Sequence, residues 1–210
     1  RLHEARVARS LEEGVHDAQA FVDGRRTPEG RHRDLTERAL GLGDNSAAIR
    51  LLERAVDLTD PATADGRVAR LELGRALTGA GRLGEAAERF ERVIAEARDA
   101  GDRALELRGR LALAAVRAQT DVTLSMSELG EFAEGTLEEL EALGDERGLA
   151  SAWYLVHWAR FRTGRFAEAI EALERVADLA RSSHDPREEV RALGQIAMAT
   201  LWGPTAVDEG

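Results

Sequence analysis

A stripe of apolar residues at helical spacing recurs along the chain. From Glu85 onward, apolar residues occupy positions i, i+1, i+4, i+7, i+8 and i+11 of a segment that contains Ala86, Ala87, Phe90, Val93, Ile94 and Ala97. This spacing places the apolar side chains on one face of an α-helix. The same stripe returns from Phe166 to Ala180 and, in weaker form, from Ala48 to Val56. The pattern therefore predicts three helices that each bury one face.

A short pattern of glycine, alanine, a large apolar residue, glutamate and arginine occurs three times. Its copies begin at Gly43, Gly81 and Gly164. The first two copies lie roughly 40 residues apart and the last two about twice that distance, which predicts a row of helical hairpins with a period near 40 residues. A stack of this kind usually binds other molecules and does not catalyse reactions.

The segments that precede the stripes complete the hairpins. Residues 66–79, 103–119 and 148–163 are apolar around more of their circumference, as expected for first helices packed between neighbours. Short turns at Gly81 and Gly164 are predicted to join the helices of a pair, because glycine adopts the left-handed conformation that ends a helix. Longer polar joints are predicted between successive hairpins, at residues 60–61, 99–102, 143–146 and 182–186.

Small residues one turn into each second helix indicate close helix packing. Ala48, Ala86 and Ala169 occupy this position, and a larger side chain there would hold the two helices of a hairpin apart. The charged pairs that follow, such as Glu91-Arg92 and Glu174-Arg175, are interpreted as a solvated outer face.

Composition excludes several kinds of chemistry. The chain of 210 residues is 43% hydrophobic and 32% charged, which is typical of a folded protein. It contains no Cys, and all 29 basic residues are arginine. Without Lys there is no Walker phosphate loop and no Schiff-base chemistry, and without Cys there are no disulfides or thiolate sites. The longest apolar stretch, Leu149 to Phe161, is too short for a membrane span and contains His157 and Arg160.

Charge argues against general binding to nucleic acid. The net charge is −10, whereas phosphates require a basic surface. One local basic strip remains an alternative, but acidic residues lie among its arginines, so a solvated loop is the favoured interpretation. The strip comprises Arg25, Arg26, Arg31, Arg33 and Arg38.

Residues that could carry catalysis or bind metals are not arranged to do so. The five histidines lack the spacing of a helical metal site. His157 lies in an apolar helix and is interpreted as a core histidine bonded to backbone or solvent, with a titrating switch as the alternative. Residues 79–84 have the form of a dinucleotide loop but join two predicted helices and follow no strand. We therefore predict no catalytic, cofactor-binding or metal-binding residues.

At these residues the chain resembles the tetratricopeptide repeat. The family's Trp and Ala match Trp153 and Ala169 in the later unit, although His157 stands where the family has Gly and the spacing exceeds the usual length of about 34 residues. In the unit near residue 67, the matching positions are Leu73, Gly74, Leu77, Ala86 and Phe90. The resemblance implies an all-α fold, a right-handed α-solenoid of about four to five tetratricopeptide-like hairpins.

The resemblance also implies where a partner would bind. First helices line the inner, concave wall of such arrays, and peptides usually dock there. Tyr154, Trp158 and Phe161 form an i, i+4, i+7 stripe on one first helix, with Arg75, Arg108 and Arg162 at neighbouring inner positions. Aromatic and arginine side chains are frequent interface anchors. In the alternative interpretation, the stripe packs against the next helix pair.

Residues 40–204 as a whole are similar to the helical-repeat region that follows the ATPase domain in large bacterial signalling ATPases. Some of these proteins are coupled to adenylate or guanylate cyclase domains or to helix-turn-helix DNA-binding domains. The matching stretches are residues 48–55, 144–150 and 201–205. This resemblance implies a sensor or regulatory arm, with any ATPase or cyclase activity in domains absent from this chain. A cytoplasmic location is expected separately, because the sequence shows neither a membrane span nor a signal pattern at its start. A free-standing peptide-binding scaffold and a nucleic-acid binder are the alternatives.

The predicted organisation has three parts. Residues 1–40 form a degenerate N-terminal helical segment with a loop at 23–33, residues 41–204 form the repeat array, and residues 205–210 are the truncated start of a further repeat. The expected partner is a protein, a peptide or another domain of the same polypeptide, with no membrane involved. Self-association through uncapped ends of the array is a further alternative.

Overall fold

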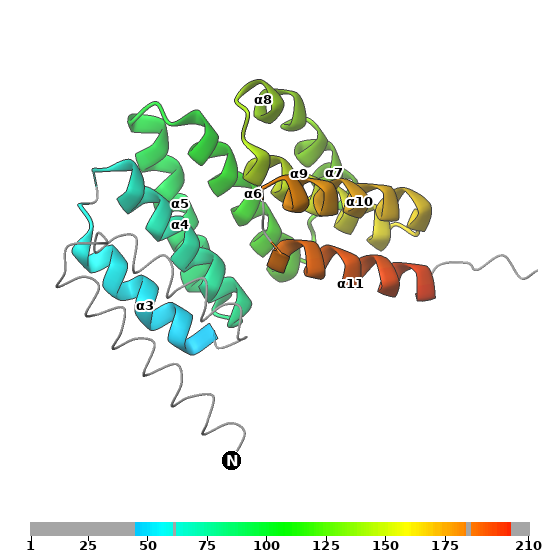
Figure 1. Cartoon of the computed structure of the whole chain (residues 1–210), viewed down its shortest axis with the longest axis horizontal. Coiled ribbons are helices and arrows are strands. Elements are labelled where there is room, and N and C mark those ends of the chain that lie inside the picture. Colours follow the sequence, from blue (N-terminus) through cyan, green and yellow to red (C-terminus); the bar gives the residue numbers. More distant parts are fainter. Residues whose placement is uncertain (1–44, 61, 184–185, 203–210) are drawn as a thin grey trace, which may run out of the picture. The chain divides into compact units, whose positions relative to one another are not determined.

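The computed structural model describes residues 45–60, 62–183 and 186–202, and the regular structure in these ranges is α-helical throughout. Packing divides the chain into two compact units, residues 1–69 and 70–210. The helices are, in chain order (Figure 1), α3 (Asn45–Leu58), α4 (Ala64–Gly79), α5 (Leu83–Asp99), α6 (Arg103–Thr120), α7 (Met126–Glu134), α8 (Leu137–Ala142), α9 (Glu146–Arg162), α10 (Phe166–Ser182) and α11 (Pro186–Trp202).

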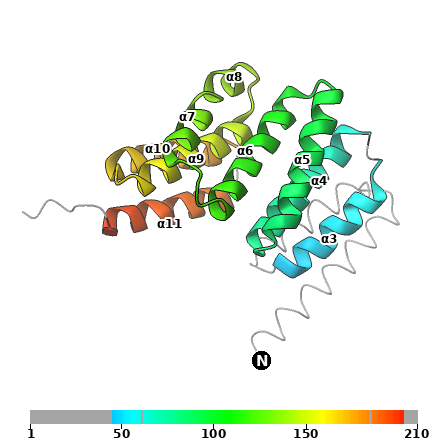
Figure 2. The same ribbon diagram turned by 180° about the vertical axis from the view of Figure 1, so that it is seen from behind.

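In the second unit, the helices pack mainly on helices that lie nearby in the sequence. The largest contacts join α5 to α6, α9 to α10 and α10 to α11, and α9 also packs against α6, α7 and α8. The front and rear views agree that α11 runs beside α10 (Figures 1 and 2). The prediction of an all-α array of tetratricopeptide-like hairpins is therefore confirmed. The predicted segments 1–40 and 205–210 lie outside the described residues.

In the first unit, the start of α4 is fixed by a polar turn. Thr63 accepts a hydrogen bond at Oγ1 from the backbone N–H of Gly66, at 3.1 Å. Arg67 donates from Nη1 to the carbonyl oxygen of Ala62, at 2.7 Å. A side chain could not replace Gly66, because an added Cβ would lie 2.3 Å from the carbonyl oxygen of Asp60. Thr63 thus caps the start of α4, a few residues after the end of α3.

Glycines in the left-handed conformation follow four of the helices. Gly81 has φ of 75° and Gly164 has φ of 79°, as predicted for the turns inside hairpins. In each turn the next N–H reaches back over the end of the helix: Arg82 donates to the carbonyl oxygen of Leu77, and Arg165 donates to that of Arg160, both at 2.9 Å. These are the backbone bonds of a Schellman motif.

The joints between hairpins at 99–102 and 143–146 differ from the prediction. The sequence predicts longer links here than within hairpins, yet Gly101 (φ 69°) and Gly144 (φ 64°) close them with the same geometry. The Asp102 N–H donates to the carbonyl oxygen of Ala97 at 2.8 Å, and that of Asp145 donates to Leu140 at 3.0 Å. Their polar composition does not lengthen the link, because the glycine alone sets the reversal.

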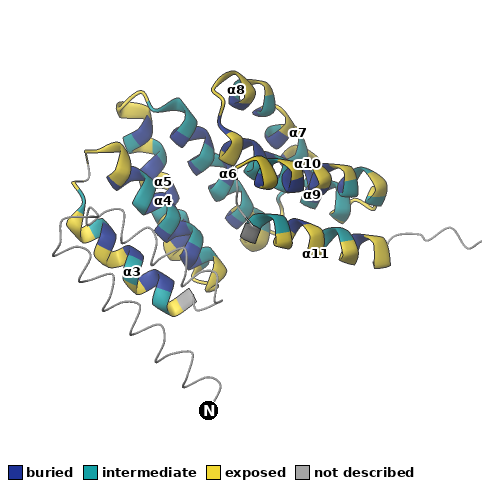
Figure 3. Cartoon of the chain, in the orientation of Figure 1, coloured by how far each residue is buried: buried dark blue, intermediate teal, exposed yellow. Residues whose placement is uncertain are grey.

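The core lies between first and second helices, as the small residues indicated. Ala48, Ala86 and Ala169 are completely buried, and Phe90 is 1% exposed. Figure 3 shows that buried and exposed positions alternate along the helices. The ring of Phe90 lies directly over Gly74 in α4, where an added Cβ would come within 2.4 Å of the ring. The predicted outer-face charges of the second helices, including Glu91, Arg92, Glu174 and Arg175, are exposed.

The second helix of the middle hairpin is broken, which the sequence did not reveal. α7 ends at Glu134 and α8 begins at Leu137, with Gly135 and Thr136 between them. The hydroxyl of Thr136 donates to the carbonyl oxygen of Ala133 at 2.7 Å, so a buried side chain satisfies part of the interrupted helical ladder. Leu129 and Leu140, one on each side of the break, are both buried.

Replacing Gly74 with Ala should destabilise the protein even though alanine favours helix. The new methyl group would collide with the ring of Phe90, and overpacking of this kind costs about 1–3 kcal/mol. Gly84→Ala is the matched control: Gly84 also lies in a helix, but an added Cβ meets nothing, so stability should rise by up to about 1 kcal/mol. Urea unfolding measures both changes, and equal stabilisation by the two substitutions would contradict the packing.

Candidate functional site

Polar and aromatic side chains from three first helices come together on one surface. Arg75 of α4 donates from Nη2 to the Ser151 hydroxyl of α9, at 3.2 Å. The Arg191 guanidinium of α11 lies over the Tyr154 ring of α9, with its carbon 4.2 Å from the ring centroid. We call this surface the first-helix face, and define it as Glu72, Arg75, Ser151, Tyr154, Glu188 and Arg191.

The arginines of the first-helix face contact glutamates of their own helices but remain accessible to solvent. Arg75 lies 3.8 Å from Glu72 on its own helix, and Arg191 is hydrogen-bonded to Glu188. The side chains of Arg75 and Arg191 are 35% and 49% exposed, respectively. Arginine carries five N–H donors, so each guanidinium keeps donors for an incoming acceptor. Sequence reasoning identified Arg75 and Tyr154 but missed Arg191, although its position in the next first helix was a usable signal.

Arg108, another predicted inner residue, forms an inward-facing ion pair. Its Nε donates to Oδ2 of Asp145 at 2.8 Å, and the two side chains are only 19% and 7% exposed. Asp145 precedes α9, so the pair ties the middle of α6 to the start of that helix. Removing one member of a buried pair leaves an uncompensated charge, which gives this contact a structural role.

The predicted aromatic stripe divides between two environments. Tyr154, His157, Phe161 and Phe166 form a chain of rings with centroid distances of 5.8, 5.8 and 5.3 Å. Trp158 packs instead against a core cluster that contains leucines from α6, α7 and α9. All three stripe residues are partly buried, whereas Arg162, at the end of α9, is exposed.

His157 is a core histidine, as the sequence favoured. It is 4% exposed, and its Nδ1–H donates to the carbonyl oxygen of Ala169 in α10 at 3.1 Å. Burial lowers the pKa of His157 below its ordinary value, and the bond to the backbone carbonyl opposes this shift only in part. The ring is therefore neutral at neutral pH and helps to hold α10 on α9.

The most buried of the described carboxylates is neutralised by arginines. Glu106 is 5% exposed and bonds to Arg103 at 2.9 Å and to Arg98 at 3.0 Å. Arg103 also forms a two-pronged bond to Glu139, with distances of 2.6 and 2.9 Å. The hydrogen bond from Arg103 and the charge of both arginines hold the pKa of Glu106 below its usual range, despite its burial. A carboxylate in this state does not serve as a general acid near neutral pH.

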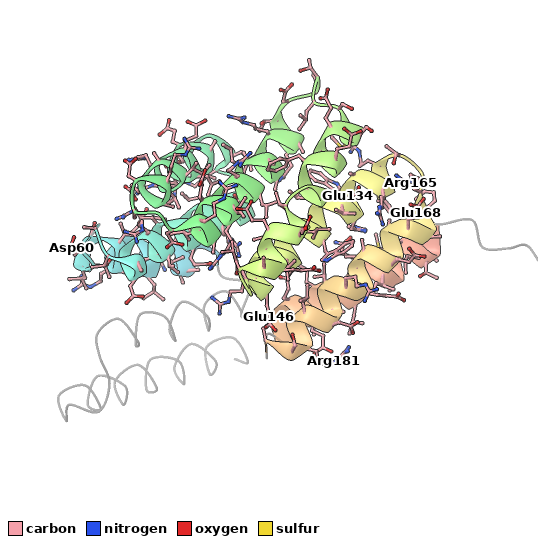
Figure 4. The ribbon with its side chains drawn as sticks, turned by 90° about the horizontal axis from the view of Figure 1, so that it is seen from above. Asp60, Glu134, Glu146, Arg165, Glu168 and Arg181 are labelled. Atoms are coloured by element: carbon pink, nitrogen blue, oxygen red, sulfur yellow. The ribbon has the colours of Figure 1, made fainter. Side chains whose placement is uncertain are left out.

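A hollow of about 480 Å³ lies where α9 meets α10, and sequence reasoning did not find it. Arg160, which lines this hollow, donates to Glu134 of α7 at 2.8 Å and to the carbonyl oxygen of Glu168 at 3.2 Å. Figure 4 shows Glu134 and Glu168 near one another at this end of α10. The hollow is lined by Trp153, Arg160, Glu171, Ala172, Glu174, Arg175 and Asp178.

The structure can also be compared with what the sequence suggested about metal sites, membrane spans, the dinucleotide-like loop and the basic strip. Within the described ranges, no three His, Cys, Asp or Glu side chains gather as a metal site would require. No described helix is both long and apolar enough to cross a bilayer. Residues 79–84 join α4 to α5 as predicted, which removes the dinucleotide-loop alternative. The basic strip from Arg25 to Arg38 and the joint histidine His184 lie outside the described residues.

The family comparison agrees with the hairpin geometry. A family model described as tetratricopeptide repeat matches residues 69–104, which include most of α4, all of α5 and the first residues of α6. No curated protein is significantly similar to the chain in sequence.

Solved structures share the fold. The crystal structure of a kinesin light chain-like protein from Podosopora anserina, with nearly identical TPR-like repeats, is 21% identical over 81% of this chain and 84% of that chain, with a TM-score of 0.50. A variant of the same Podosopora anserina protein is 19% identical over 81% and 93% of the two chains, again with a TM-score of 0.50. A MamA RS-1 double mutant is 16% identical over 82% and 94%, with a TM-score of 0.41. The first two establish a tetratricopeptide-like fold for this chain.

Protonation of His157 should destabilise the fold. Its pKa is lowered in the folded state, so its contribution is complete above about pH 6.5, the ordinary histidine value, and is lost as the pH falls below it. His157→Asn keeps a donor for the Ala169 carbonyl but does not titrate. The free energy of unfolding, measured from about pH 7.5 to about pH 5, should fall more steeply for the wild type than for this variant. Parallel curves would contradict the argument.

Trp158→Ala should reduce stability by about 2 kcal/mol or more, because the indole packs against the core cluster. Arg162→Ala, on the same helix but exposed, should change stability by less than about 0.5 kcal/mol. Thermal and urea unfolding distinguish the two substitutions. An unchanged midpoint for Trp158→Ala would assign the side chain to an interface and not to the core.

Proposed function

We propose that this chain is a non-catalytic interaction module that binds a protein or peptide through the first-helix face. The observation that carries the proposal is the pair of contacts from Arg75 to Ser151 and from Arg191 to Tyr154. They bring exposed arginine donors and an aromatic ring from α4, α9 and α11 onto one surface. Such residues anchor protein interfaces more often than other surface residues do. Arg108, Trp158, Phe161 and Arg162 belong to the wider candidate region around this face.

The chemistry of the first-helix face favours an extended segment with acceptor groups. Arg75 and Arg191 offer donors to backbone carbonyls or to a carboxylate, and Tyr154 offers apolar area beside them. Glu72 lies 3.8 Å from Arg75, and Glu188 already accepts a hydrogen bond from Arg191, so a ligand carboxylate would have to compete with them. We therefore favour a peptide whose main-chain carbonyls meet the arginines and whose apolar side chain covers Tyr154.

We further propose that the module is the sensor or scaffold arm of a larger bacterial signalling ATPase or transcriptional regulator, working in the cytoplasm. The support is the resemblance of residues 48–55, 144–150 and 201–205 to the helical region of such proteins. In that setting the partner is another domain of the same polypeptide or a separate protein. A free-standing peptide-binding scaffold is the alternative, and the gene sequence upstream separates the two, because an ATPase domain would show a Walker loop.

Removing both arginines of the first-helix face should abolish partner binding. Partners captured from a cell extract by the purified chain are identified by mass spectrometry and then produced for binding measurements. Arg75→Ala/Arg191→Ala should weaken binding at least tenfold, whereas Arg54→Ala/Arg92→Ala, which removes two exposed arginines elsewhere, should not. Circular dichroism verifies that both variants fold. Equal binding by the two double variants would refute the assignment of this face.

Nucleic-acid binding through the strip from Arg25 to Arg38 is the second alternative. The net charge of −10 opposes it, so no binding to a fluorescent DNA duplex or RNA oligomer is expected. The measurement is made at about 50 mM salt, where phosphate contacts are strong. Binding that weakens steeply with added salt, and that is lost when these arginines are replaced, would favour the alternative.

A further inference from the structure

The hairpin formed by α6 and α7 is packed less closely than the following hairpin, formed by α9 and α10. Helix α10 packs along α9, whereas α7 packs mainly on α9 and makes few contacts with α6. Gly130 permits the approach of α7 to α9, because an added Cβ would lie 3.2 Å from the Cβ of Ala159. Five residues, 121–125, join α6 to α7, while three residues, 163–165, join α9 to α10. Helix α7 is therefore held by the next hairpin more than by its own.

The order of small and large residues accounts for this loose packing. Counted back from the left-handed glycine that follows it, α5 carries a small residue at one position and a large residue four positions later, Ala86 and Phe90. At the same two positions relative to the glycine that follows α8, α7 carries Leu129 and Ala133. The large residue stands where close approach requires a small one, and the small residue does not fill the groove.

A hollow of about 260 Å³ opens between α6 and α7. Its apolar wall consists of Leu113 and Ala114 of α6, Leu124 of the connecting loop, and Leu129 and Phe132 of α7. Pockets for small-molecule ligands usually measure about 300–1,000 Å³, so this hollow is of a size that suits one inserted side chain. We call it the α6–α7 hollow.

Arginines dominate the charged lining of the α6–α7 hollow. The guanidinium carbon of Arg110 lies 5.4 Å from the centroid of the Phe132 ring, and within the described residues Arg110 forms no ion pair. Arg117 lies 3.4 Å from Glu91, but both side chains are more than half exposed, so this ion pair is weak. Among the described acidic residues, only Glu128 lines the hollow. The lining is locally basic, although the net charge of the chain is −10.

The next hairpin shows which groups an arginine at this position binds. Arg160 follows Arg117 by 43 residues, which is also the separation between the starts of α6 and α9. Arg160 donates to the carboxylate of Glu134 at 2.8 Å and to the main-chain carbonyl of Glu168 at 3.2 Å, and its side chain is 18% exposed. The Arg117 side chain is 59% exposed. Arg117 therefore keeps donors for a carboxylate and a main-chain carbonyl.

We propose that the α6–α7 hollow binds an acidic peptide segment of a partner protein, with one apolar side chain inside the hollow and a carboxylate on either side of it. Charge complementarity selects this occupant, since Arg110 and Arg117 both face an apolar space that has a single carboxylate in its lining. The two arginines are seven residues apart on α6, or about 10 Å along the helix axis. An extended peptide covers that distance with about three residues, which fits two acidic residues around an apolar one.

The hollow lies within the described array and not at its end. Helices α5 and α9, which pack on α6, are both described, and neither contributes a residue to the lining. No neighbouring helix of the stack therefore closes it.

The α6–α7 hollow is separate from the region around the first-helix face. On α6 that region includes Arg108, which pairs with Asp145. Arg117 comes nine residues after Arg108, or two and a half helical turns, and so lies on the opposite side of α6. The proposal adds a second binding surface to the module, and it does not depend on binding at the first face.

The probe is a synthetic octapeptide with one leucine between aspartates. Added to the full 210-residue chain, labelled at its leucine methyl groups for NMR, it should shift the signals of Leu113, Leu124 and Leu129 in a saturable manner, with a Kd below about 1 mM. Octapeptides in which asparagine replaces the aspartates, or alanine replaces the leucine, should bind at least tenfold more weakly. The absence of saturable shifts, shifts centred on other helices, or equal binding of the asparagine peptide would overturn the proposal.

Arg110→Gln/Arg117→Gln should weaken binding of the aspartate octapeptide at least tenfold, because both charged donors are lost. The matched control is Arg92→Gln/Arg147→Gln, which removes the same charge from exposed positions outside the hollow and should bind like the wild type. Circular dichroism verifies that both variants fold. Equal binding by the two double variants would remove the arginines from the site and refute the proposal.

Sedimentation equilibrium tests a second copy of the chain as the occupant. The expected result is a monomer at about 100 µM, a concentration at which weak self-association is detectable. A dimer that Arg110→Gln/Arg117→Gln dissociates would overturn the proposal in favour of self-association. Partner capture through Arg75 and Arg191 is measured separately, so loss of octapeptide binding with intact capture refutes the α6–α7 hollow alone.

Discussion

The seating of a large side chain of one helix over a small residue of the preceding helix determines the rest of this structure. The ring of Phe90 over Gly74 shows the contact directly, and the buried alanines Ala86 and Ala169 permit the close approach. A left-handed glycine separates α4 from α5 and α9 from α10, so the chain reverses at a fixed register. Hairpins built in this way bury one stripe internally and offer another to the next element, which is why the array grows by stacking.

Ion pairs between helices neutralise the carboxylates that this packing buries. Because every basic residue is arginine, buried carboxylates receive planar, multidentate donors: Glu106 meets Arg98 and Arg103, and Asp145 meets Arg108. Figure 4 shows similar charged groups along α10, with Arg165 and Glu168 at one end and Arg181 at the other. These contacts leave the buried acids paired with arginine donors, which suits a scaffold better than acid–base chemistry.

The first-helix face of the second unit remains accessible after this packing. The first-helix face offers arginine donors and a tyrosine ring, which suits an extended chain with acceptor groups.

The sequence by itself determined the helices, their pairing and the turns at Gly81 and Gly164, because apolar spacing and left-handed glycine are local properties of the chain. It also assigned His157 to the core and residues 79–84 to a helix connection. Only the tertiary structure decided which inner residues meet: Arg108 turns to Asp145, Trp158 joins the core cluster, and Arg191 reaches Tyr154. The break between α7 and α8 at Gly135 was equally hidden, since the burial of Leu129 and Leu140 on its two sides depends on packing against other helices.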